Sequence, residues 1–114
     1  MAARAAILLL VLLSASGANG AADDERSPVR IEEAWRLACP LVAHLDSRGC
    51  GFPGVHEVFT SQRRETDGSL YYIVVLRAGS SSPDYFVYRA GAATRDVTFV
   101  EYSSDIDELR RRYR

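Results

Sequence analysis

Residues Leu70–Tyr102, LYYIVVLRAGSSSPDYFVYRAGAATRDVTFVEY, hold three apolar runs that are rich in β-branched and aromatic side chains. Turn residues separate the runs, a pattern that is typical of antiparallel strands. The first of these strands begins at Leu70, and the other two are expected at Tyr85–Ala90 and Asp96–Tyr102. Because the strand from Leu70 carries apolar side chains on both faces, it is expected to lie inside the sheet.

One more strand is expected before this stretch. Val55–Arg63 is more polar than the later runs, as an edge strand should be. The dipeptide Asp67-Gly68 is a hairpin signal that joins this strand to the next. Gly79–Asp84, GSSSPD, is expected to be an exposed loop.

Upstream of the strands, an apolar stripe at helical spacing predicts one helix from Pro28 to about Asp46. Ser27 is the expected N-cap, with Pro28 at the first helical position. Pro40 falls on the solvent side of this helix, where it should bend the helix without interrupting the stripe. The stripe consists of Ile31, Ala34, Trp35, Ala38, Leu41, Val42 and Leu45.

At the C-terminus, Ser103-Ser104-Asp105 predicts the start of a short helical turn with Ile106, Leu109 and Tyr113 on one side. The fold class expected for residues 27–114 is therefore α+β in a single domain. One N-terminal helix should pack on a four-stranded antiparallel meander, with a short C-terminal helical turn and one disulfide.

The first twenty residues predict a secretory signal peptide, since one Arg precedes an apolar run that ends in small residues. Residues 21–26, AADDER, are expected to be a disordered lead-in. The apolar run is shorter than the roughly 20 residues of a membrane-spanning helix, so a released, secreted or periplasmic protein is predicted. Without the leader, 13 basic and 15 acidic side chains remain, a balance that favours neither nucleic acid nor an anionic membrane as partner.

Cys39 and Cys50 are the only cysteines, and an even number in an exported chain indicates a disulfide. The alternative is a zinc site made by these two cysteines with His44 and His56. The spacings contain no C-x2-C or H-x3-H pair, which disfavours zinc. The prediction is therefore one disulfide and no metal site.

The sequence contains no phosphate-binding glycine loop, paired-carboxylate motif or dinucleotide-binding fingerprint, so no cofactor is expected. The only histidines, His44 and His56, fall on different predicted elements and have no visible nucleophile partner. The interpretation favoured by these observations is a protein without catalytic residues.

The most informative feature of the composition is the large number of tyrosines on the predicted strands. One helix can cover only one face of a sheet, so some strand tyrosines are expected on an uncovered face that recognises a protein. The core rim or a homodimer interface is the alternative interpretation. The candidate partner-binding residues are Tyr71, Tyr72, Tyr85, Tyr88 and Tyr102.

The helix followed by YYIVVLRAG and PDYFVYRAGAATRDVTFVE (71–79 and 83–101) resembles, in architecture, the small exported helix-on-sheet domains of the PepSY and cystatin-like kind. The turn Ala90–Arg95 departs from the acidic and Thr-Gly pattern of PepSY turns, and the cystatin Q-x-V-x-G hairpin is absent. The resemblance implies a non-enzymatic domain that binds another exported protein, as an inhibitor or an immunity-type protein does.

Two alternatives remain open. An NTF2-like ligand-binding or hydrolytic domain would show a deep cavity lined by Trp35 and tyrosines, with His44 or His56 inside. A purely structural secreted protein would lack an exposed aromatic cluster.

Overall fold

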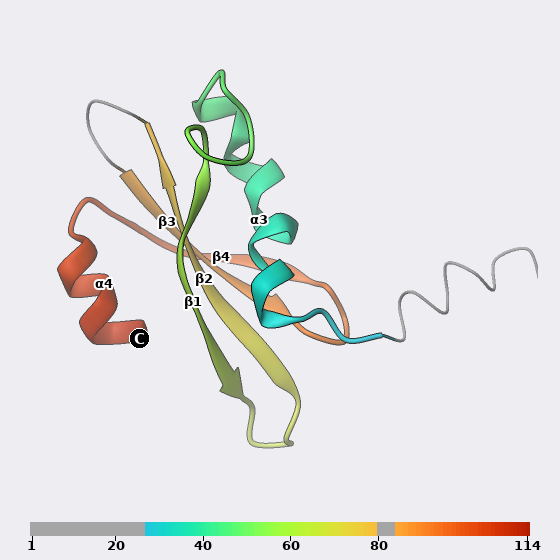
Figure 1. Ribbon diagram of the computed structural model, residues 1–114. Coiled ribbons are helices and arrows are strands. Elements are labelled where there is room, and N and C mark those ends of the chain that lie inside the picture. The colour runs from blue at the N-terminus through green and yellow to red at the C-terminus, as the bar shows by residue number, and fades with distance from the viewer. Residues whose placement is uncertain (1–26, 80–83) are drawn as a thin grey trace, which may run out of the picture.

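The computed structural model describes residues 27–79 and 84–114, which form an α+β domain (Figure 1). The predicted signal peptide, the predicted lead-in and the inner part of the predicted 79–84 loop lie outside the described residues. In chain order the elements are η1 Ile31–Glu33, α3 Trp35–Val42, η2 Ala43–Leu45, β1 His56–Arg64, β2 Leu70–Ala78, β3 Asp84–Gly91, β4 Val97–Ser103 and α4 Ile106–Tyr113, where η is a 3-10 helix.

The four strands form the predicted antiparallel meander in the order β1-β2-β3-β4, so β1 and β4 are its two edges. In the register, Val74 of β2 lies opposite Tyr88 of β3, and Tyr88 lies opposite Phe99 of β4. The strand ends differ from the predicted ends by one or two residues. In the β1–β2 turn, Gly68 has a φ of 91°, a left-handed conformation that a residue without a Cβ adopts at little cost.

The N-terminal helix is shorter than the sequence predicts. Instead of one bent helix from Pro28 to about Asp46, the structure has the eight-residue α3 with the 3-10 turns η1 and η2 at its two ends. Pro40 lies inside α3 and is exposed, as predicted.

The predicted helix start at Ser27 and Pro28 is wrong. The backbone N–H of Val29 donates to the carbonyl of Ala92 at 2.8 Å, which ties this part of the chain to the β3–β4 turn. The first helical turn therefore begins only after Arg30, whose side chain makes no capping hydrogen bond.

The buried stripe of α3 is rotated relative to the predicted stripe. Cys39, which is not part of the predicted stripe, is fully buried, whereas Leu41 and Leu45, which belong to that stripe, are about half exposed. The Sγ atom of Cys39 lies 3.7 Å from the carbonyl oxygen of Val55, so this flank of α3 faces the start of β1. The core between α3 and the sheet consists of Val29, Ala34, Ala38, Cys39, Val42, Val55, Tyr72, Val74, Leu76, Ala78, Phe86, Tyr88 and Ala92.

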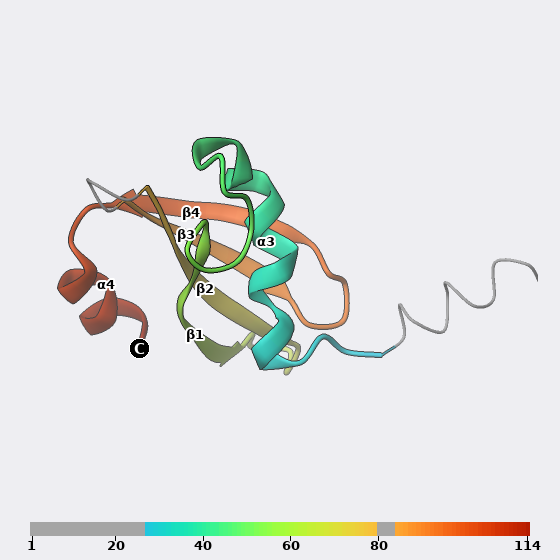
Figure 2. The ribbon, with the colours of Figure 1, turned by 45° about the horizontal axis from the view of Figure 1, so that its top comes forward.

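The second face of the sheet is covered by α4, which lies on the opposite side of the sheet from α3 (Figures 1 and 2). The expectation that one helix leaves a whole sheet face uncovered is therefore wrong. The predicted helical turn is a full helix of eight residues. The core on this side consists of Phe59, Ile73, Val75, Tyr85, Val87 and Leu109.

Polar contacts at both ends hold α4 across the sheet. At its start, the Asp105 carboxylate accepts hydrogen bonds from the backbone N–H groups of Asp107 and Glu108, which makes Asp105 the N-cap of α4. At its end, Arg63 of β1 donates to the carbonyl oxygen of Tyr113 at 2.8 Å. These contacts explain how so short a helix keeps a fixed place.

The predicted disulfide between Cys39 and Cys50 is confirmed, with the two Cα atoms 6.0 Å apart. It joins α3 to the segment just before β1 and closes a loop of 11 residues in sequence separation. Because both sulfur atoms are used in this bond, neither cysteine can serve as the thiolate ligand of the alternative zinc site.

A carboxylate inside this loop should make stability depend on pH. Both oxygens of the buried Asp46 accept hydrogen bonds from the Arg48 guanidinium at 2.9 Å, which lowers the pKa of Asp46 from 3.8 to about 2. Since the folded-state pKa is the lower one, the carboxylate stabilises the fold above about pH 4, and this contribution is lost as the pH falls toward 2.

We expect Asp46→Asn to be less stable than wild type at neutral pH and to lose less stability between pH 4 and pH 2. Urea unfolding at a series of pH values measures this difference, with the exposed Asp96→Asn as the matched control. Parallel pH curves for wild type and Asp46→Asn would contradict the assignment.

Candidate functional site

The five candidate tyrosines do not form one exposed cluster. Tyr72, Tyr85 and Tyr88 are buried in the two cores, Tyr71 is half-buried, and Tyr102 is 54% exposed. The structure therefore leaves only Tyr102 fully available to a partner. Tyr85 is covered by α4, whereas Tyr72 and Tyr88 lie under α3.

The buried tyrosines have structural contacts. The hydroxyl of Tyr72 donates to the carbonyl oxygen of Val29 at 2.6 Å, which holds the N-terminal segment on the sheet. Burial raises the pKa of Tyr72 and of Tyr88, so both stay neutral and act as amphipathic core side chains. The alternative interpretation, in which the tyrosines belong to the core, therefore holds for Tyr72 and Tyr88.

Tyr71 lies on the α4 side of the sheet, where the Arg89 guanidinium stacks over its ring at 3.8 Å from the ring centre. Arg89 also forms an ion pair with Glu65. This three-residue contact joins β2, β3 and the β1–β2 turn. It occupies the face of the Tyr71 ring, so a partner would meet the arginine first.

An exposed aromatic surface does exist, on the edge strand β4. Phe99 and Tyr102 are each 54% exposed, and they lie opposite Tyr88 and Phe86 of β3. Both ring pairs are edge-to-face, with ring centres 5.5 Å apart for Tyr88 and Phe99 and 5.3 Å apart for Phe86 and Tyr102. Since Tyr88 and Phe86 belong to the α3-side core, Phe99 and Tyr102 lie on that same face, beyond the edge of the helix.

The hydroxyl of Tyr102 is held in place by Asp84 at the start of β3. It donates to the Asp84 carboxylate at 2.6 Å, and this hydrogen bond raises the pKa of Tyr102. An exposed ring that is already fixed loses less side-chain entropy on binding than a free one. Tyr102 is therefore preorganised for contact with a partner.

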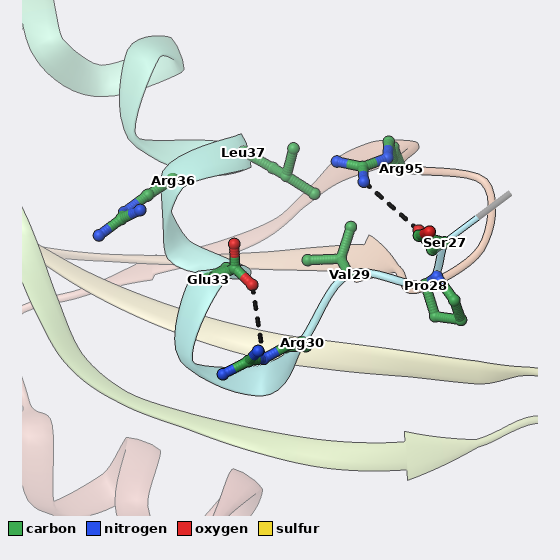
Figure 3. A pocket seen from close by; sticks show the side chains of 8 residues that line it. All are labelled: Ser27, Pro28, Val29, Arg30, Glu33, Arg36, Leu37 and Arg95. Carbon is green, nitrogen blue, oxygen red and sulfur yellow. Dashed lines mark hydrogen bonds and ion pairs between the residues drawn. The ribbon is translucent and has the colours of Figure 1, made fainter. Parts of the chain in front are cut away.

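The exposed flank of α3 lies on the same face of the sheet as these two rings. Leu37 points toward Arg95 of the β3–β4 turn (Figure 3), and Leu41 lies one helical turn further along the same flank. Leu41 is 50% exposed. We define the α3–β4 surface as Leu41, Phe99 and Tyr102.

A hollow of about 520 Å³ lies at the hairpin end of this surface (Figure 3). Its apolar wall includes Val29 and Leu37, and its rim carries Arg30, Arg36 and Arg95. The Arg30 guanidinium is paired with Glu32 at 2.6 Å and with Glu33 at 3.6 Å.

Arg36 gives the hollow its positive character. Arg36 contacts the Trp35 ring at 5.7 Å from the ring centre and has no carboxylate partner within residues 27–79 and 84–114. Arg95 donates to the carbonyl oxygen of Ser27 at 3.4 Å. The hollow therefore places positive charge next to the apolar α3–β4 surface.

The two histidines lie on different elements, as predicted. His44 is exposed in η2, whereas the His56 ring lies 2.7 Å from the carbonyl oxygen of Gly54 and packs edge-to-face on Phe52. Between α3 and β2 the space is filled by buried side chains, and neither histidine lies in it. The cavity that an NTF2-like domain requires, with Trp35 and a histidine inside, is not found between these elements.

Two other classes of site depend on features of the described part of the chain. Within it, no group of three or more His, Cys, Asp or Glu side chains could hold a metal ion. No helix there is long and apolar enough to cross a membrane.

Sequence reasoning found Tyr102 but missed Leu41, which it placed in the buried stripe of the helix, and Phe99, because it considered only tyrosines as candidates. The signal that could have found Phe99 is position: β4 is the last strand of a meander and therefore an edge, whose outer half a helix does not reach. Comparisons of the chain with protein-family models, with curated proteins and with solved structures find no match.

Proposed function

We propose that this protein is an exported, non-catalytic binding domain that uses the α3–β4 surface to contact another exported protein, as an inhibitor or an immunity-type protein. The observation that carries the proposal is the pair of half-exposed, fixed aromatic rings of Phe99 and Tyr102 on an edge strand. Export is supported by the leader-like first twenty residues and by the disulfide.

The surface has the composition of a protein-recognition site. Aromatic side chains at the centre of an interface carry much of its binding energy, and a charged rim adds orientation and specificity. Here Phe99 and Tyr102 supply the aromatic centre, and Arg36 supplies a positive rim at one end. The partner that fits brings apolar side chains to β4 and acidic side chains to the hairpin end.

The test is affinity capture of the partner from the exported proteins of the source organism. We expect the double variant Phe99→Ala, Tyr102→Ala to bind the captured partner about 30- to 25,000-fold more weakly than wild type, since each of the two aromatic anchors contributes roughly 1–3 kcal/mol. Binding is measured by titration calorimetry with the purified partner. Circular dichroism checks that the variant stays folded.

Two control variants make the result specific. Phe52→Ala removes an aromatic ring that is 84% exposed but lies in the loop before β1, so it should bind as wild type does. His44→Ala with His56→Ala should also leave binding intact. If the β4 variant, folded, binds with wild-type affinity, the α3–β4 surface is not the binding site.

A further inference from the structure

A second, smaller hollow lies where β1 begins and β2 ends. Its volume is about 180 Å³. His56 lies directly opposite Arg77 in the β1–β2 register, so these two side chains lie on the same face of the sheet. We call it the Arg77 hollow, and its lining consists of Arg48, Phe52, Pro53, His56, Arg77 and Gly79. It shares no residue with the α3–β4 surface and is therefore a separate site.

The guanidinium of Arg77 has a hydrogen-bond donor without a partner. Its Nε atom is buried and makes no hydrogen bond within residues 27–79 and 84–114, and no carboxylate of these residues pairs with the side chain. Buried polar groups nearly always have a partner, so this donor is a candidate for binding a ligand. Because Nε is already out of water, an anion gains more from this guanidinium than from one that is fully hydrated.

Arg48, the other arginine of the Arg77 hollow, already has a partner. Its guanidinium donates to both oxygens of Asp46 at 2.9 Å, so the Asp46 carboxylate balances its charge. The hollow therefore holds one uncompensated arginine charge, on Arg77. This charge matches the single charge of a carboxylate better than the nearly double charge of a phosphate group.

The wall beside Arg77 is formed by rings. Phe52 is 84% exposed, and its ring packs edge-to-face against His56 with the ring centres 5.3 Å apart. The His56 ring is held in turn, since its Nδ1 atom lies 2.7 Å from the carbonyl oxygen of Gly54. Pro53 adds an apolar ring to the same wall. An aromatic or apolar group can therefore pack here next to the Arg77 guanidinium.

The volume of the hollow limits the size of the ligand. About 180 Å³ corresponds to roughly six water molecules and is below the roughly 300 Å³ at which the pockets of drug-sized ligands begin. We propose that the Arg77 hollow binds a small monocarboxylic acid with an aromatic or apolar body. The carboxylate accepts hydrogen bonds from the guanidinium of Arg77, and the body packs against Phe52 and Pro53.

The experiment titrates benzoate into the purified protein and follows the backbone amide signals by NMR. We expect saturable shifts that are largest for the residues of the hollow. Arg77→Gln should bind benzoate at least about 10-fold more weakly, because it removes a charge-assisted hydrogen bond. Benzamide, which has the same shape without the charge, should bind wild type more weakly by about the same factor. Inorganic phosphate, which has no apolar body, should also bind more weakly than benzoate.

Two further variants make the test specific. Arg36→Gln removes an arginine from the hollow at the hairpin end and should bind benzoate as wild type does. Phe52→Ala removes a ring that is mostly in solvent, so it should stay folded and bind benzoate more weakly, with no change for phosphate. Circular dichroism verifies the fold of each variant.

Three results would overturn the proposal. They are the absence of saturable shifts in wild type, wild-type affinity in a folded Arg77→Gln, and an equal loss in Arg36→Gln. If Arg77→Gln does not fold, Phe52→Ala decides, and unchanged benzoate binding in that variant would also overturn it. The titration needs no second protein, so its outcome is independent of the proposed function.

Discussion

Replacing both Cys39 and Cys50 by Ala is expected to lower the free energy of unfolding by about 3 kcal/mol, the contribution of a disulfide that closes a loop of this length. The described domain is small, so its core supplies little stability in reserve. The bond also fixes the buried flank of α3 against the start of β1. Urea unfolding followed by circular dichroism measures the change.

Reductant provides the control for the disulfide prediction. Wild-type protein unfolded in the presence of a reducing agent should lose about the same stability as the double variant. The double variant itself should not respond to reductant. Equal stability of the oxidised wild type and the double variant would contradict the role given to this bond.

Replacing Leu109 by Ala is expected to cost about 3 kcal/mol, within the range for truncating a fully buried leucine. Leu109 is the buried side chain of α4 and lies among Ile73, Val75 and Val87 on the second sheet face. Its loss leaves a cavity under the helix. The same urea unfolding measures the effect.

The matched control for Leu109 is the exposed neighbour Arg110→Ala, which should change stability by less than about 1 kcal/mol. A loosened α4 would also expose the second sheet face, so binding of a hydrophobic dye should rise in Leu109→Ala only. If Leu109→Ala is as stable as wild type, α4 does not cover that face.

The sheet was predictable because its information is local. Alternating and continuous apolar runs between turn residues indicate the strands, and Asp67-Gly68 marks a hairpin, so the meander follows from residues close together in the chain. The disulfide was predictable for a similar reason, since a chain with two cysteines has one possible internal pairing.

The helices were less predictable because contacts distant in sequence decide them. The first helix begins late because the backbone of Val29 is hydrogen-bonded to Ala92. The buried side of the helix is rotated toward Cys39, the side that faces Val55. The extent of α4 depends on Arg63, fifty residues before Tyr113, and on the sheet face that it covers. No periodicity within Ile106–Tyr113 shows that these partners are present.

The candidate site differs from the predicted one because contacts distant in sequence also decide which tyrosines are buried. Tyr72, Tyr85 and Tyr88 were predicted at a binding surface because the sequence provided only one covering helix, and α4 places Tyr85 in a core. Tyr72 and Tyr88 lie under the first helix, a choice of sheet face that the sequence left open. Phe99 and Tyr102 remain exposed because β4 is an edge strand and lies beyond the edge of α3.

The most direct test of the central claim is photo-crosslinking at Phe99. Benzoylphenylalanine replaces Phe99 in one variant and Phe52 in another, and each purified variant is irradiated with the exported proteins of the source organism. The account predicts a specific adduct from position 99, abolished by excess wild-type protein, and none from position 52, although Phe52 is the more exposed ring. An adduct from position 52 alone, or no competed adduct from position 99, would contradict it.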